Sequence, residues 1–136
     1  MTKIAPDMIA PDAELIEQLA RDAVTNLPEQ FRASATHILV YIEDFASIDL
    51  LDVMGIDDPY ELTGLYDGTP LTERSASDPP RTADRIFLFR RPILDEWIER
   101  GDVSLAELVT HVMIHELAHH FGWSDEDIAT IDPWWE

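Results

Sequence analysis

The sequence predicts an α+β fold, in which a small mixed sheet of three to four strands is packed by helices. Two observations support this prediction. Residues 37–42 and 86–89 are apolar runs of strand length, rich in β-branched and aromatic side chains. Longer segments with helical spacing of apolar residues flank them and begin at capping residues. The chain has 136 residues, of which 46% are hydrophobic, so we expect a single domain over residues 1–136.

The first half of the chain opens with an arm and a helix. Residues 1–11 contain two prolines and are expected to form a loose arm. Asp12 can cap a helix that runs to about Asn26. The nearly unbroken apolar run at 37–42 then predicts a central, buried strand. We interpret His37 as a residue at the end of this strand and not as a metal ligand, because nothing nearby completes a ligand pattern.

The middle of the chain predicts a short helix followed by a hairpin. Residues 45–54 carry apolar side chains at helical spacing, and residues 61–66 are a second strand. Asp67-Gly68 is a turn signal, with a short partner strand from Leu71 onward. Residues 75–82 form the most loop-like segment of the sequence and are a candidate flap over a site.

Two helices follow the strand at 86–89. Pro92 is expected to open the first of these helices, which ends at Gly101. Ser104, followed three residues later by a glutamate, is a capping box for the second helix. Gly122 predicts the end of that helix, because glycine readily takes the left-handed conformation that turns the chain.

The strongest signal lies on the last predicted helix, where residues 115–119 read His-Glu-Leu-Ala-His. The spacing of His115 and His119 puts both imidazoles on one face, about one turn apart, where they can hold one metal ion. Glu116 flanks that face, about 100° round the helix from His115. Three such groups predict zinc-assisted hydrolysis, most often of a peptide bond, with Glu116 as the base that deprotonates water at the metal.

A catalytic zinc site needs three protein ligands and one open position. Asp125 follows ten residues after His115 and completes the pattern H-E-x-x-H-x-x-G-x-x-D. We therefore expect one zinc ion per chain, held by His115, His119 and Asp125. The apolar side chains on most faces of this helix also predict that both histidines lie in a buried wall.

Other interpretations of these side chains stay open. The two motif histidines can be an ordinary helical pair, and Asp125 can belong to the first turn of a following helix. His111 lies one turn before the motif and offers a competing pair, but this pair leaves the rest of the motif unexplained. His120 lies about 100° round the helix from His119, so we interpret it as a structural residue or one that supports a ligand from outside.

Residues 115–125 resemble zincin metallopeptidases, and within them a small bacterial family of minimal zincins. Two other stretches are similar to further signatures of that family. They are residues 62–75, which read LTGLYDGTPLTERS, and residues 84–92, which read DRIFLFRRP. Together the three stretches span most of residues 36–128, so the resemblance is specific.

The resemblance implies a minimal zincin-like fold with an active-site helix that carries H-E-x-x-H. It implies His115, His119 and Asp125 as zinc ligands and Glu116 as catalytic base. The larger zincin groups fit less well: metzincins usually have histidine in place of Asp125 and a methionine turn after it, and no methionine follows here.

Zincins bind an extended substrate as an added strand at the edge of the sheet. The resemblance implies that a strand from residues 64–74 or 85–90 has this role, and the sequence does not distinguish the two. Tyr66 and Arg90 are possible contacts to substrate or to an oxyanion. Packing or ion pairing at the strand ends is the favoured alternative for both side chains.

Composition excludes several classes of partner. The chain has 28 acidic and 9 basic residues, a formal net charge of −19, which disfavours nucleic acid and membrane surfaces. It has no cysteine, hence no disulfide and no thiolate zinc site. No apolar run has the ~20 residues of a membrane span, and the N-terminus lacks a secretory h-region, so we expect a cytoplasmic protein.

The predicted function is therefore zinc-dependent hydrolysis of a peptide or protein substrate. The first alternative is a non-catalytic zinc-binding domain that contacts proteins through its acidic surface and its tryptophan tail, Trp134 and Trp135. The favoured interpretation of these two tryptophans is that they pack over the fold. The second is a metal-dependent RNase, which the glutamate of the motif and the net charge disfavour. The sequence leaves the substrate, the cleavage preference and the oligomeric state open.

Overall fold

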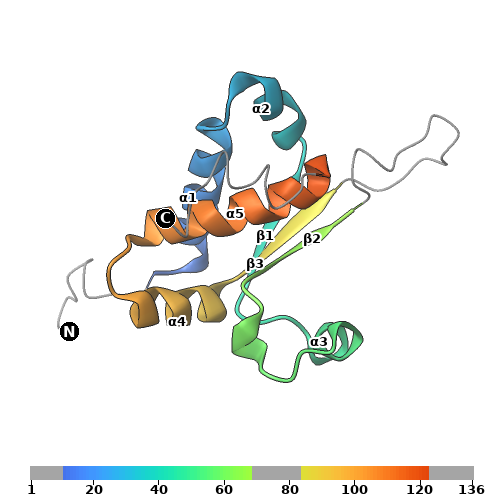
Figure 1. Cartoon of the computed structure of the whole chain (residues 1–136), viewed down its shortest axis with the longest axis vertical. Helices are drawn as coiled ribbons and strands as arrows, with labels where there is room; N and C mark the ends of the chain where they lie inside the picture. Colours follow the sequence, from blue (N-terminus) through green and yellow to red (C-terminus); the bar gives the residue numbers. More distant parts are fainter. Residues whose placement is uncertain (1–10, 69–83, 123–136) are drawn as a thin grey trace, which may run out of the picture.

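The computed structural model describes residues 11–68 and 84–122 of the chain, coloured in Figure 1. In chain order, these residues form seven segments with bounds close to the predicted ones and two that were not predicted, α2 and η2. The elements are α1 (Ala13–Thr25), α2 (Glu29–Ala35), β1 (Leu39–Glu43), α3 (Ile48–Met54), the 3₁₀ turn η2 (Pro59–Glu61), β2 (Gly64–Asp67), β3 (Arg85–Phe89), α4 (Arg90–Arg100) and α5 (Leu105–Phe121).

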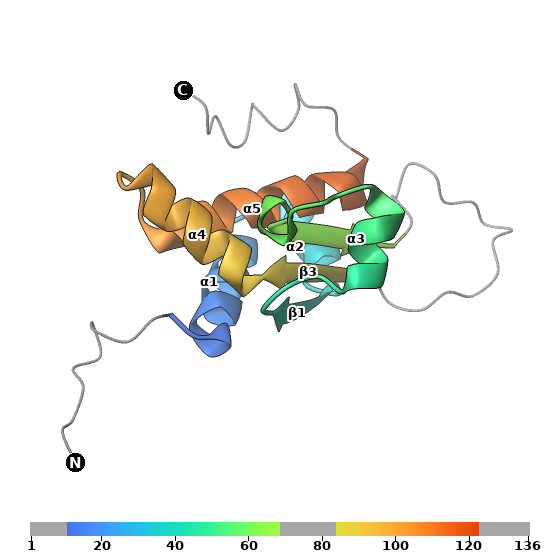
Figure 2. The ribbon, with the colours of Figure 1, turned by 90° about the horizontal axis from the view of Figure 1, so that it is seen from below.

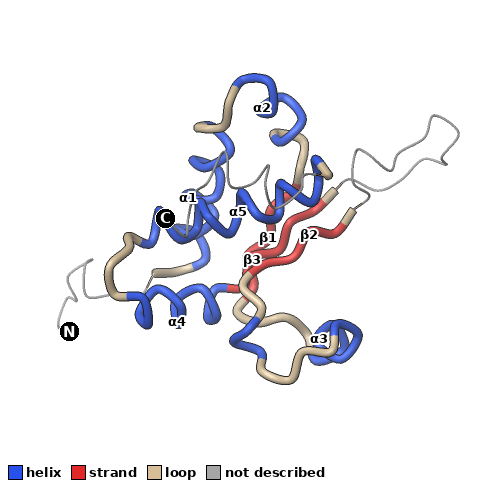
Figure 3. The backbone as a smooth tube through the Cα atoms, in the orientation of Figure 1, coloured by secondary structure: helices blue, strands red, loops and turns tan. Residues whose placement is uncertain are grey.

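The three described strands form one mixed sheet in the order β1-β3-β2 (Figure 3). β1 runs parallel to β3, with Leu39 opposite Arg85. β2 runs antiparallel to β3, with Gly64 opposite Leu88. The predicted α+β class, with a small mixed sheet packed by helices, is confirmed.

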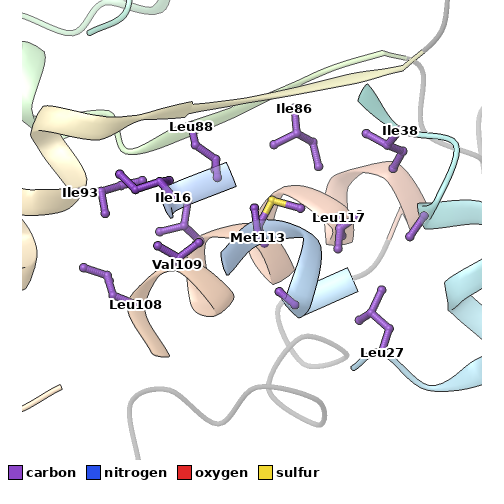
Figure 4. Close-up of a cluster of buried hydrophobic side chains, with 14 of the residues drawn as sticks. Ile16, Leu27, Ile38, Ile86, Leu88, Ile93, Leu108, Val109, Met113 and Leu117 are labelled. Atoms are coloured by element: carbon purple, nitrogen blue, oxygen red, sulfur yellow. The ribbon is translucent and has the colours of Figure 1, made fainter. Parts of the chain in front are cut away.

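The two faces of the sheet bury different side chains of β3, as the two-residue period of a strand requires. Ile86 and Leu88 enter the main core beneath α1 and α5, where Ile16, Met113 and Leu117 meet them (Figure 4). The other face of β3 packs against α3 and the segment around η2 in a smaller cluster. α5 contacts β2 and β3 and runs along the β2 side of the sheet, as Figure 2 shows.

The prediction that residues 37–42 form a central strand is wrong for the described sheet. β3 is central, and β1 lies at one edge. Leu39 and Tyr41 are 46% and 43% exposed, and Tyr41 stacks on Phe87 with ring centroids 5.5 Å apart. An apolar run reports strand propensity, but which strand is central depends on pairings between distant segments. His37 is exposed and lies just before β1.

The hairpin prediction needs a similar correction. Among the described residues, the antiparallel partner of β2 is β3, and Leu71 and residues 75–82 lie outside the described ranges. Of the predicted arm, Pro11 is described, and its carbonyl accepts a hydrogen bond of 2.9 Å from Arg90 Nη1. No helix in the described part of the chain is long and apolar enough to span a membrane.

Candidate metal and catalytic site

The helix α5 carries the site and is defined at both ends by local chemistry. The Ser104 side chain accepts a hydrogen bond of 3.0 Å from the Glu107 N–H, which is the predicted N-cap. Gly122 ends the helix in the left-handed conformation, with φ of 73°. Buried side chains lie on most of its faces, so the site residues stand on an element that core packing holds in place.

Two neighbouring stripes of side chains run along α5, each with a spacing of four residues. The first stripe consists of His111, His115 and His119. The second consists of Val112, Glu116 and His120. The first stripe contains the predicted metal ligands, and the second packs on β2, as the contacts below show.

The described histidines of the motif differ in burial. His115 is partly buried and lines a cavity of about 290 Å³, whereas His119 is exposed. The prediction that both histidines lie in a buried wall is therefore wrong for His119. The reason is position: His119 lies in the last turn of α5, beside the C-cap and outside the lining of the cavity.

Glu116 lies against β2 because Gly64 leaves room for it. A Cβ atom at Gly64 would lie 3.3 Å from Glu116 Cγ and 2.9 Å from Val112 Cγ1. Burial raises the pKa of Glu116 from its ordinary value of 4.5 to about 7, and a hydrogen bond from the Tyr66 backbone N–H lowers it in part. A carboxyl with a pKa near neutrality is suited to general-base catalysis.

The cavity joins the helix to the start of β2. Its walls are the segment from Glu61 to Gly64, the side chain of Glu96 on α4, and His111, Val112, His115 and Glu116 on α5. A peptide segment in this cavity would therefore lie beside His115, a predicted ligand, and Glu116, the predicted base.

The sequence offers His111 as a competing pair for His115, and the structure places the two side chains together on the cavity wall. The His111 ring lies 4.5 Å from the His115 ring, edge to face, and both rings line the cavity. The spacing of four residues from His115 was the signal that placed it on the same stripe.

His120 is buried, 2% exposed, and faces away from the cavity. Its Nδ1 atom lies 3.2 Å from the Tyr66 hydroxyl and 3.4 Å from Asp84 Oδ2. This position agrees with the interpretation of His120 as a structural or supporting residue. Tyr66 therefore faces His120 with its hydroxyl and Glu116 with its backbone N–H.

Arg90 does not line the cavity. Its guanidinium pairs with Asp44 at 2.8 Å and with the Pro11 carbonyl, so it ties the start of α4 to the end of β1. The favoured alternative for Arg90, an ion pair at a strand end, is what the structure shows.

The described residues supply two of the three expected metal ligands. His115 and His119 are imidazoles one turn apart, which suits zinc. Within residues 11–68 and 84–122, no group of three His, Cys, Asp or Glu side chains is placed to hold a metal. Asp125, the third predicted ligand, lies outside the described residues, as do Trp134 and Trp135. The ligand role of Asp125 stays a prediction, as do those of His115 and His119.

Comparison with protein families gives one match. The sequence model of the family described as zincin-like metallopeptidase matches residues 35–135, well over half of the chain. The chain belongs to this family. Membership of the zincin-like metallopeptidases confirms the resemblance and supports a metallopeptidase function in general, with zinc as the usual metal. A comparison with curated proteins finds no match.

Proposed function

We propose that this zincin-like metallopeptidase binds one zinc ion through His115, His119 and Asp125 and hydrolyses peptide bonds with Glu116 as general base. The observation that carries the proposal is the place of Glu116. It lies beside the histidine stripe, on the wall of the cavity, with a pKa of about 7.

Zinc, when bound, supplies Lewis-acid chemistry: it polarises the scissile carbonyl and makes water easier to deprotonate. Glu116 then accepts a proton from the attacking water and passes it to the leaving amine nitrogen. Burial of Glu116 favours this role, because a desolvated carboxylate holds a proton more tightly than an exposed one. A nearby cation would lower the pKa of Glu116 and so keep the carboxyl ionised until it accepts the proton.

The edge of β2 that faces away from β3, which no described strand covers, supports an extended peptide as the substrate. The Thr63 carbonyl accepts a hydrogen bond of 2.9 Å from the Phe89 N–H, so Thr63 faces β3. Alternate residues of an antiparallel strand face opposite sides, so the backbone groups of Gly64 and Tyr66 point away from β3, where the Tyr66 N–H already donates to Glu116. Gly64 lines the cavity beside Glu116. Of the two candidate edge regions, residues 64–74 are favoured, since β3 is central in the described sheet.

Metal content is the first test. Protein purified without added metal is measured by elemental analysis, with wild type beside Asp125→Ala and His119→Ala. About one zinc per chain in the wild type, lost or weakened in both variants, is the expected result. No zinc in the wild type after zinc is offered would contradict the proposal.

Hydrolysis is the second test. A quenched fluorescent peptide library is cleaved by the zinc-loaded wild type, and Glu116→Gln lowers the rate by about 10²–10⁴-fold with zinc retained. Glu99→Gln, at an exposed position of α4 outside the cavity lining, is the control and keeps activity. Zinc binding without any cleavage would favour the alternative, a non-catalytic zinc-binding domain that contacts proteins.

A further inference from the structure

We propose that His120 is a positioning residue that acts through Tyr66 to hold the carboxylate of Glu116 in its place. The inference rests on the proposed function for its catalytic meaning, but the contacts that support it do not depend on zinc. His120 does not line the cavity, and it meets β2 at the Tyr66 hydroxyl, so its role is to orient another residue.

Glu116 and His120 share one face of α5. Glu116 and His120 are four residues apart and therefore lie on the same stripe, which packs on β2. One residue of β2 meets both of them. The Tyr66 backbone N–H donates to the Glu116 carboxylate, and the Tyr66 hydroxyl shares a hydrogen bond of 3.2 Å with His120 Nδ1. Tyr66 is thus held at two points by one helix.

Asp84 is a further partner of the same His120 ring nitrogen. Asp84, immediately before β3, places Oδ2 3.4 Å from the same Nδ1 atom. The Asp84 carbonyl accepts a hydrogen bond of 3.0 Å from the Leu39 N–H of β1. The imidazole therefore links the helix to the strand beside it and to the start of the central strand.

The side chains of Tyr66, His120 and Asp84 form a closely packed cluster. A Cβ atom at Gly68 would lie 2.2 Å from Asp84 Oδ1 and 2.6 Å from the Tyr66 hydroxyl. His120 is 2% exposed. Hydrogen bonds in such a dry and closely packed place have few alternative partners, so they define one arrangement of the strand on the helix.

The hydrogen bond between Tyr66 and His120 therefore controls the position of the Glu116 carboxylate. If the Tyr66 hydroxyl loses its partner, the strand can shift on the helix, and the backbone N–H no longer fixes the carboxylate. A misplacement of about 1 Å at a reacting group can cost on the order of 10²-fold in rate. Because His120 does not contact substrate, this loss falls on kcat and leaves KM unchanged.

The test begins in metal-free, ¹⁵N-labelled protein, with amide hydrogen exchange read by NMR. Tyr66→Phe removes only the hydroxyl, and Tyr41→Phe, an exposed tyrosine of β1, is the matched control. We expect exchange at residue 66 to become about 10-fold faster in Tyr66→Phe, with the β3 amides unchanged. His120→Leu should have the same effect, and His120→Asn, whose amide replaces Nδ1, should restore protection.

Several outcomes overturn the proposal. Unchanged exchange at residue 66 in Tyr66→Phe would show that the hydroxyl does not hold the strand. Faster exchange throughout β3 would show a general structural role. A residue-66 amide that does not respond to Glu116→Ala would remove the link to the carboxylate. If Tyr66→Phe does not fold, the comparison of His120→Asn with His120→Leu decides by the same amide.

Activity gives a separate measurement. Where the zinc-loaded wild type cleaves the peptide library, Tyr66→Phe should lower kcat about 10-fold or more with KM and zinc content unchanged. A raised KM with unchanged kcat would overturn positioning in favour of a substrate contact. If the wild type binds zinc but cleaves nothing, the proposed function fails while the amide measurement still decides the role of His120.

Discussion

At the scale of single residues, the chain places a carboxyl where its charge is poorly solvated. Gly64 lets β2 approach α5 so closely that Glu116 is largely shielded from water, and one backbone N–H offsets only part of that cost. Such a group has a use in catalysis and a cost in stability. The same residue therefore offers a test of the site that needs neither metal nor substrate.

We predict that Glu116→Gln stabilises the metal-free protein at high pH. The folded pKa of about 7 lies above the ordinary 4.5, so the contribution of this carboxyl to stability is complete below about 4.5. It is lost as the pH rises through about 7. The glutamine side chain does not ionise, and its amide oxygen can still accept a hydrogen bond from the Tyr66 N–H. The variant should therefore match the wild type near pH 4.5 and exceed it by about 1–3 kcal/mol at pH 8.

Urea unfolding in the presence of a chelator measures this difference at the two pH values. Glu96→Gln removes a charge from the same cavity wall and controls for the change in net charge. A difference between Glu116→Gln and wild type that stays constant from pH 4.5 to pH 8 would contradict burial of Glu116. The expected rise with pH would support it.

At the scale of elements, α5 combines two predicted metal ligands with the contacts that hold the helix on the sheet. Its two stripes differ in their contacts: His111 and His115 of the first line the cavity, and Val112, Glu116 and His120 of the second lie against β2. The turn at Gly122 then sets the direction in which the chain leaves the helix, three residues before the predicted ligand Asp125. α4 also ends at a glycine with positive φ, Gly101, and no predicted ligand lies in the first ten residues after it.

These two glycines form a matched pair for a prediction. Both have φ of 73°, so alanine at either position costs about 1–2 kcal/mol of stability. Gly122→Ala should also weaken zinc binding by about 10-fold or more, because it redirects the chain before Asp125. Gly101→Ala should leave zinc affinity unchanged. Titration with zinc and urea unfolding give both quantities, and equal zinc affinities in the two variants would contradict the role of Asp125 as a ligand.

At the scale of the whole molecule, the charge is strongly one-sided. The sequence has 28 acidic residues and only 9 basic ones. Several of the basic residues are in ion pairs, such as Arg90 with Asp44 and Arg85 with Asp67. Unbalanced carboxylates repel one another in the folded state more than in the expanded unfolded chain. The molecule therefore carries an electrostatic cost that depends on the ionic strength.

We predict that moderate salt stabilises the protein. Raising sodium chloride from about 20 to 300 mM shortens the screening length from roughly 20 Å to 6 Å and weakens the repulsion between carboxylates. The melting temperature should rise by roughly 2–5 °C. A thermal melt followed by circular dichroism measures it, with a neutral solute of equal osmolality as control. A melting temperature that falls with salt would show that attractive ion pairs outweigh the repulsion.

The sequence by itself determined the features that depend on neighbouring residues. The ends of α5 at Ser104 and Gly122, and the stop of α3 at Gly55, follow from local capping and from glycine conformations. The spacing of His115, Glu116 and His119 follows from the period of a helix alone. For this reason the helix, its motif and the α+β class could be predicted without any knowledge of the packing.

Only the tertiary structure decided how distant segments meet. The apolar run before Glu43 is at an edge because β3 pairs with β1 on one side and β2 on the other. The environment of Glu116 depends on a glycine 52 positions earlier in the chain, and the place of His120 depends on Tyr66 and Asp84. Contacts across such distances depend on the packing of the whole fold, and neither side-chain periodicity nor local propensity encodes them.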